Sequence, residues 1–196
     1  MNIYIFGLGA IGSNILSQLA RKYPDFHYYG IDCDKVEERN ISTQSYFLTH
    51  VGLPKSHAIL PAIGTKVSKF KYKPFFQKID SKIDIEELIK NTSKNEPALL
   101  LDCFDNTESR KLFEDIPGDI LHIGFSPQYA AEILWQENYS SPDNLKPEED
   151  DICVMAEAVP FITFVTSMAT FVISNYIDTT IKDNYIITNK MVITKL

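Results

Sequence analysis

The chain has 196 residues, of which 44% are hydrophobic and 12% aromatic, and this composition excludes a largely disordered protein. Its length suits one domain, which we expect to span residues 1–196. The formal net charge of -7 excludes a general nucleic-acid binder, because phosphate backbones are bound by clustered cations. The three cysteines are far apart and lack C-x-x-C spacing, so we expect no zinc site, no disulfide framework and a cytoplasmic location.

Strands and helices are predicted in alternation along most of the chain. Short runs of β-forming residues predict strands over residues 2–6, 27–31, 75–79, 97–102 and 120–123. Apolar residues at helical spacing predict helices over residues 11–23, 56–66, 83–90, 107–113 and 158–177. An antiparallel strand over 129–136 and a hairpin formed by 184–188 and 191–195 are expected to follow the parallel strands. This order predicts an α/β fold with a Rossmann-like, doubly wound, mainly parallel sheet and antiparallel C-terminal strands.

Three segments could indicate other classes of protein. Basic and aromatic residues alternate over 69–73, which favours a strand at the solvent edge of the sheet over a nucleic-acid contact. Residues 158–177 carry no charge, but their proline, threonine and serine residues favour a helix buried against a sheet over a membrane span. Residues 140–151 contain two prolines and end in four acids, and we expect an acidic crossover loop there.

Three glycines follow the first predicted strand and open the first predicted helix. Gly7 permits a tight turn, Gly9 lets the backbone approach a phosphate, and Gly12 allows the helix to pack closely on the strand. Asp32 comes twenty positions after Gly12, at the end of the second predicted strand, where a carboxylate can accept both ribose hydroxyls. The alternative is a glycine turn that only packs. The arrangement predicts an adenine-nucleotide site, and Asp32 argues against a 2′-phosphorylated cofactor.

Four further segments carry a family resemblance. They read Gly-Ile-Asp-Cys-Asp-Lys-Val-Glu-Glu-Arg-Asn from residue 30, Val-Gly-Leu-Pro-Lys from residue 51, Leu-Leu-Asp-Cys-Phe-Asp-Asn from residue 100 and Cys-Val-Met-Ala-Glu-Ala-Val-Pro from residue 153. With the glycine turn, they resemble the ThiF/MoeB/HesA family, the E1-like adenylyltransferases that activate ubiquitin-like proteins and sulfur carriers. The resemblance covers residues 2 to about 176.

The resemblance implies an activity and a set of site residues. Members bind ATP and Mg²⁺, and the C-terminal carboxylate of a small ubiquitin-like or sulfur-carrier protein attacks the α-phosphate to give an acyl adenylate and pyrophosphate. Lys55 would then contact the phosphates, Asp105 would hold Mg²⁺, and Asp32, Asp34 and Asn40 would bind the nucleotide. It also implies a homodimer.

Each of these residues has a simpler interpretation. Lys55 could be an ordinary solvated lysine near a helix start. Asp105 could cap the helix that follows it. We expect Arg110, in that helix, to be structural and to pair with Glu114 at i,i+4 spacing.

The chain departs from the family pattern at several places. Thr43 stands where relatives carry an arginine that reaches the phosphates, and Arg39 could supply that charge instead. Cys153 stands where some relatives have a cysteine used in sulfur or thioester chemistry, so a covalent role is open, although four preceding acids disfavour its thiolate. Many relatives also have an N-terminal helix with an arginine, which we do not expect here.

Two other functions remain open. A protein with the same fold could bind ATP without turnover, as a scaffold, and Thr43 supports that interpretation. An NAD-dependent oxidoreductase would explain the glycine turn and Asp32, but it leaves Asn40, Lys55 and Asp105 without a role.

Overall fold

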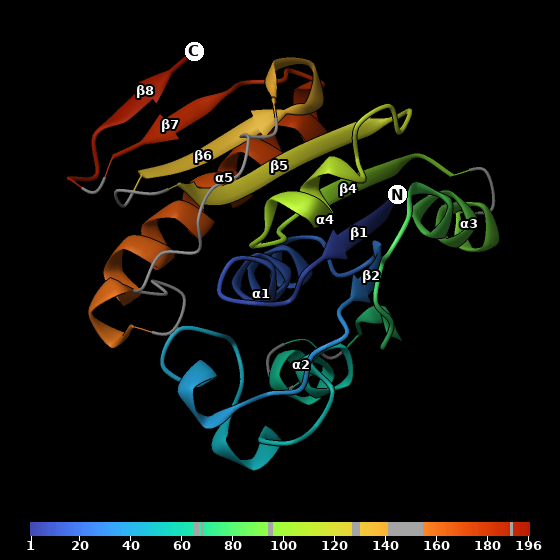
Figure 1. Ribbon diagram of the computed structural model, residues 1–196, viewed down its shortest axis with the longest axis vertical. Coiled ribbons are helices and arrows are strands. Elements are labelled where there is room, and N and C mark those ends of the chain that lie inside the picture. Colours follow the sequence, from blue (N-terminus) through green and yellow to red (C-terminus); the bar gives the residue numbers. More distant parts are fainter. Residues whose placement is uncertain (65–66, 68, 94–95, 127–129, 141–154, 189) are drawn as a thin grey trace.

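The computed structural model describes residues 1–64, 67, 69–93, 96–126, 130–140, 155–188 and 190–196. Its strands are β1 (Asn2–Phe6), β2 (His27–Ile31), β3 (Lys71–Phe75), β4 (Ala98–Asp102), β5 (Asp119–Ser126), β6 (Ala130–Trp135), β7 (Tyr185–Ile187) and β8 (Ile193–Lys195). They form one sheet in the order β3-β2-β1-β4-β5-β6-β7-β8 (Figure 1). Pairs from β3 to β5 are parallel and pairs from β5 to β8 are antiparallel, which confirms the predicted fold class.

Helices pack on both faces of this sheet (Figure 1). They are α1 (Gly12–Lys22), α2 (Lys55–Gly64), α3 (Lys82–Thr92), α4 (Thr107–Lys111) and α5 (Val159–Thr179), with 3-10 turns η1 (Glu38–Asn40), η2 (Leu48–His50), η3 (Gln136–Asn138) and η5 (Ala156–Ala158). In β1, Ile3 and Ile5 join the core beneath α1, α2 and α5, whereas Tyr4 and Phe6 join the core beside α3. Because both faces are covered, the central strands are apolar without alternation.

The strand order reverses direction between β1 and β4. From β1 the chain builds outward through β2 to β3, and it then returns to add β4 and β5 on the other side. The loops at the carboxyl ends of β1, β2 and β4 therefore meet at one edge of the sheet. In doubly wound folds a ligand binds at this point, because the connections diverge and leave a crevice.

The third strand lies earlier in the chain than predicted. The prediction over 75–79 was wrong, because β3 consists of Lys71–Phe75 and ends where that range begins. The expectation of an edge strand over 69–73 is confirmed, since β3 is at the end of the sheet and pairs with β2. The side chains of Lys71 and Lys73 are exposed, and the intervening Tyr72 donates a hydrogen bond to the carbonyl of Ser56 at 2.6 Å.

The long apolar helix is partly buried. Among the described residues, one segment, Ala156–Thr179, is long and apolar enough to cross a membrane, with a mean hydropathy of 1.6. In the structure Val165, Ala169 and Val172 of α5 are buried in the core shared with α1. Core helices of globular proteins meet the same criterion, and 39% of the apolar window of α5 is buried in the structure.

Candidate active site

The glycine turn between β1 and α1 is held by steric constraints at two of its three glycines. Gly7 has φ +87°, and a Cβ atom there would lie 2.8 Å from the carbonyl oxygen of Cys103. A Cβ atom on Gly12 would lie 1.9 Å from the carbonyl oxygen of Gly7, so the start of α1 can approach β1 only with glycine. A Cβ atom on Gly9 would meet nothing within 4 Å. Gly9 therefore borders open space at the N-terminal end of α1, where backbone N–H groups attract anions.

Asp32 joins the end of β2 to this turn. Its Oδ2 accepts the N–H of Leu8 at 2.7 Å, and its Oδ1 accepts the N–H of Asp34 at 2.7 Å. Burial raises the pKa of Asp32, although Lys55 and the two N–H donors lower it. A carboxylate oxygen accepts more than one hydrogen bond, so both oxygens retain capacity for ribose hydroxyls.

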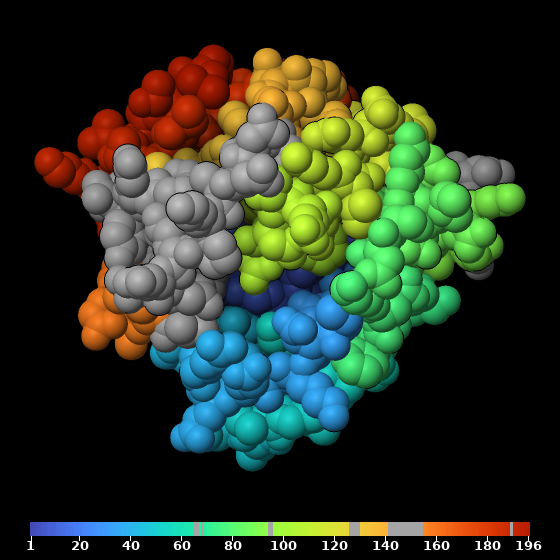
Figure 2. Space-filling model, in the orientation of Figure 1, coloured from blue at the N-terminus to red at the C-terminus, as the bar shows by residue number. Residues whose placement is uncertain are grey.

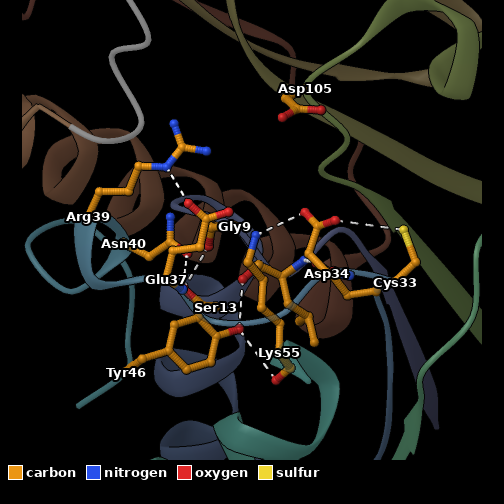
Figure 3. Close-up of polar contacts among 12 residues, drawn as sticks. Gly9, Ser13, Cys33, Asp34, Glu37, Arg39, Asn40, Tyr46, Lys55 and Asp105 are labelled. Carbon is orange, nitrogen blue, oxygen red and sulfur yellow. Dashed lines mark hydrogen bonds and ion pairs between the residues drawn. The ribbon is translucent and has the colours of Figure 1, made fainter. Parts of the chain in front are cut away.

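Lys55 is a buried cation at the start of α2. Its side chain is only 10% exposed, so the alternative of an ordinary solvated lysine is wrong. The Nζ atom lies 3.1 Å from Oδ2 of Asp34, and the backbone N–H of Lys55 donates to the carbonyl of Asp34 at 2.9 Å. Figure 3 shows the Asp34 carboxylate and the Lys55 amine beside Gly9 and below the loop that carries Asp105. Asp34 therefore orients Lys55 toward the site.

Asp105 lies in the loop that follows β4. Its carboxylate is exposed and accepts a hydrogen bond from Nδ2 of Asn106 at 3.3 Å. The alternative that Asp105 caps α4 is wrong, because the cap is Asn106, whose Oδ1 accepts the N–H of Ser109 at 2.8 Å. Asp105 and Arg39 project from opposite sides, with Gly9 between and below them in the view (Figure 3).

Asn40 and Arg39 belong to the η1 turn after β2. Asn40 is buried, and its Oδ1 accepts the N–H of Glu37 at 2.9 Å, so its amide oxygen supports the turn. Arg39 is exposed, and its Nε donates to Oε2 of Glu37 at 2.6 Å. The turn thus presents a charged, solvent-accessible side chain beside the glycine turn.

Several polar residues that were not singled out from the sequence support the site from behind. Ser13 donates to the carbonyl of Gly9 at 2.6 Å, and its Oγ accepts the N–H of Ser45 at 3.1 Å. Tyr46 donates to the carbonyl of Leu8 at 2.8 Å. These bonds tie the irregular segment after β2 to the glycine turn. Serine and tyrosine are common in loops, so nothing in their spacing indicated this role.

The residues present suit a nucleoside triphosphate with Mg²⁺. Figure 2 shows the N-terminal segment at the floor of a hollow between the segments that follow β2 and β4. Figure 3 shows Gly9 and Lys55 close together, and the N–H groups of this turn and the lysine cation supply the chemistry that phosphates require. Among the described residues no three His, Cys, Asp or Glu side chains form a metal cluster. Mg²⁺ is commonly held by one or two carboxylates together with substrate phosphates, and Asp105 offers such a ligand.

The family model of the "ThiF family" matches residues 1–118, which include every site residue described above. The chain belongs to the ThiF family. No curated protein sequence matches it. The family match gives no support to the alternative of an NAD-dependent oxidoreductase.

Solved structures of ThiF-like proteins share the fold. PaaA has a TM-score of 0.72 at 17% sequence identity, covering 100% of this chain and 63% of PaaA. MccB of E. coli with ATP has a TM-score of 0.74 at 14% identity, covering 100% of this chain and 63% of MccB. MccB with AMPCPP and MccA has a TM-score of 0.74 at 13% identity, covering 62% of MccB. This ThiF-family chain therefore spans less than two thirds of these neighbours, and at such identities the likeness concerns the fold.

Two departures from the family pattern have different outcomes. Thr43 is buried, and its carbonyl accepts a hydrogen bond from Nδ2 of Asn14 at 2.8 Å, so this position serves the packing of α1. Cys153 and residues 141–151 of the expected acidic loop lie outside the described residues. The covalent role of Cys153 stays a prediction.

Proposed function

We propose that this ThiF-family chain is an ATP-dependent adenylyltransferase that activates the C-terminal carboxylate of a small protein. One observation carries the proposal. The loops after β1, β2 and β4 bring the open glycine turn, the buried cation of Lys55 and the carboxylate of Asp105 to the same edge of the sheet. A site that binds a nicotinamide cofactor for hydride transfer needs neither the lysine nor the aspartate.

The residues divide the work of the reaction. The N–H groups at the start of α1 bind the phosphates, and Asp32 accepts the ribose hydroxyls. A carboxylate oxygen of the partner attacks the α-phosphorus, and the bond from that phosphorus to the bridging oxygen breaks, so pyrophosphate leaves. Lys55 and Arg39 neutralise the charge that develops on the phosphate oxygens. Asp105 would hold Mg²⁺, which polarises the phosphates when it is bound.

Arg39 takes the place of the missing family arginine in this proposal. Its side chain is 63% exposed, and its Nε atom lies 2.6 Å from Oε2 of Glu37. A triphosphate carries more charge than one carboxylate and would compete for the guanidinium. Arg39→Ala should then lower the rate of adenylate formation more than it lowers ATP affinity.

The partner is proposed to be a ubiquitin-like or sulfur-carrier protein with a C-terminal glycine. The structures that hold MccB together with MccA support a partner for this fold in general. We further propose a homodimer and a cytoplasmic location, as the family resemblance implies. Light scattering of the purified chain would give its mass, and a mass of one chain would contradict the dimer.

Exchange of labelled pyrophosphate into ATP tests the activity. The wild type should exchange label when the cognate small protein is present, because adenylate formation is reversible. Lys55→Ala and Asp105→Ala should reduce exchange by at least about 100-fold, the scale of losing one charge-stabilising group. Lys90→Ala and Asp178→Ala, at exposed helix positions far from the turn, serve as matched controls. Exchange that survives both site variants would contradict the proposal.

A binding protein without turnover is the second candidate. It is favoured by Thr43, whose burial gives the phosphates no cation at that position. Calorimetry would then show ATP binding that depends on Lys55, while no adenylate forms with any small protein tested.

A further inference from the structure

A buried pair of polar side chains lies at the base of the loop that carries Asp105. Asp102 ends β4 and is fully buried, and its Oδ2 lies 2.8 Å from Nδ1 of His122, which is 1% exposed and belongs to β5. The second oxygen of the same carboxylate, Oδ1, accepts the N–H of Phe104 at 3.1 Å. The position of the Phe104 peptide thus depends on the orientation of Asp102.

Contacts on both sides fix the orientation of the His122 ring. The Nε2 of Gln136 donates to the carbonyl of Phe113 at 3.4 Å, and the Oε1 of Gln136 is in close contact with Nε2 of His122. One ring nitrogen therefore contacts Asp102 and the other contacts Gln136. The ring also stacks on Tyr139 with centroids 3.7 Å apart.

Arg110 holds the next peptide group, between Phe104 and Asp105. Its Nε donates to the carbonyl of Phe104 at 2.8 Å, and its Nη2 donates to the carbonyl of Ile123 at 2.9 Å. Room for the guanidinium comes from Gly124, where a Cβ atom would lie 2.1 Å from Nη2. The predicted pairing of Arg110 with Glu114 is therefore wrong, because the side chain points into the sheet.

Arg110 supplies positive charge to this cluster. Glu132 of β6 lies 3.6 Å from Nη1 of Arg110. Burial raises the pKa of Glu132, whereas Arg110 lowers it. Burial lowers the pKa of Arg110, but Asp102, Tyr139 and Glu132 outweigh burial and raise it. The guanidinium therefore stays charged and stabilises the buried carboxylates around it.

We propose that His122, through Asp102, and Arg110 are positioning residues that fix the backbone of Phe104 and thereby orient Asp105, which would hold the metal. The proposal rests on the proposed function, in which Asp105 holds Mg²⁺. Asp102 grips the N–H of Phe104 and Arg110 grips its carbonyl, so the residue before Asp105 is held at both ends. Asp105 itself is exposed and depends on this anchor for its direction.

Metal binding tests the proposal without any partner protein. Mn²⁺ binding is measured by electron paramagnetic resonance in the presence of a non-hydrolysable ATP analogue. His122→Gln should weaken Mn²⁺ binding by about 10-fold or more, the effect expected when a group that orients a metal ligand is lost. Affinity for the analogue without metal should stay unchanged. His27→Gln is the matched control. His27 is half-exposed and begins β2, so it lies at the opposite end of the parallel strands from the site.

A second variant tests the support of the His122 ring. Gln136→Leu should weaken Mn²⁺ binding in the same direction as His122→Gln, and it serves if His122→Gln does not fold. Unchanged Mn²⁺ binding in both variants overturns the proposal. A wild type that binds no Mn²⁺ with the analogue also overturns it. A wild type that binds Mn²⁺ as expected but shows no pyrophosphate exchange would contradict only the proposed function.

Discussion

The glycines of the first turn separate folding from binding at the scale of single residues. Gly12 touches backbone, with 1.9 Å between its hypothetical Cβ atom and the Gly7 carbonyl oxygen, whereas Gly9 has no neighbour within 4 Å of that position. Gly12→Ala should therefore lower the free energy of unfolding by on the order of 3 kcal/mol. Gly9→Ala should leave it within about 1 kcal/mol of the wild type. The same Gly9→Ala change should weaken ATP binding about tenfold or more, a loss of about 1.4 kcal/mol.

Urea unfolding and calorimetry with ATP measure these two effects. Equal destabilisation by the two alanines would contradict the open space at Gly9. Unchanged ATP affinity in Gly9→Ala would show that the phosphates do not bind at this turn.

Asp32 predicts opposite pH dependences for stability and for nucleotide binding. Burial raises its pKa above the usual 3.8, and Lys55 lowers it by a smaller amount. The native state therefore binds the proton more tightly than the unfolded state. Protonated Asp32 therefore stabilises the native state. This contribution to the free energy of unfolding is fully present when the pH is below the usual pKa of an aspartate, and it is lost as the pH rises through the raised pKa of Asp32. Binding of ribose hydroxyls requires the carboxylate, so ATP affinity should fall as the pH is lowered through the same pKa.

The comparison with Asp32→Asn isolates this group from the titration of ATP itself. The variant should bind ATP more weakly than the wild type at neutral pH, and this difference in ATP affinity should become smaller as the solution is acidified. A difference in affinity that stays constant from pH 7 to pH 4 would show that Asp32 does not contact the nucleotide.

At the scale of elements, β3 shows how an edge strand is protected. It pairs with β2 at the end of the sheet, and its exposed lysines, Lys71 and Lys73, interrupt what would be an apolar edge. Replacing both with valine should increase aggregation, measured as light scattering at constant concentration. The matched change, Lys22→Val with Lys90→Val, removes the same charge from exposed helix positions and should scatter less. Equal scattering would mean that net charge, not the edge, controls solubility.

The helix α5 separates a packed face from an exposed one. Ala169 is fully buried where α5 packs in the core shared with α1, while Phe171 is 58% exposed. Ala169→Leu should lower the free energy of unfolding by about 1–3 kcal/mol, because a close-packed core has no room for added carbon atoms. Phe171→Ser should change it by less than about 0.5 kcal/mol. Thermal unfolding of the two variants in buffer without detergent measures the difference, and equal effects would contradict this packing.

At the scale of the whole molecule, ligand binding should be visible as stability. A ligand that binds only the native state at 100 times its dissociation constant adds about 2.7 kcal/mol. For a chain of this size we expect ATP with Mg²⁺ to raise the melting temperature by roughly 5–10 °C. NAD should raise it by much less, and Lys55→Ala should remove the effect of ATP. A larger shift with NAD than with ATP would favour the oxidoreductase alternative.

The sequence by itself determined the features that depend on short stretches of chain. The apolar run of β4, the glycine turn before α1 and the position of Asp32 after β2 were all predicted, because strand periodicity and turn chemistry are local. The family resemblance rested on the same kind of short segments, and the ThiF match confirms it. The strand over 75–79 was wrong, whereas the alternating lysines over 69–73 correctly indicated an edge strand, and β3 is that strand.

Only the tertiary structure decided which distant side chains meet. Lys55 reaches Asp34 across 21 positions, Asp102 meets His122 across 20, and Arg110 turns away from its helical neighbour toward the sheet. The register of β4 against β5, and the missing side chain of Gly124, place these groups together. Such contacts depend on how strands are ordered in space. A pattern along the chain carries no record of that order until the sheet has formed.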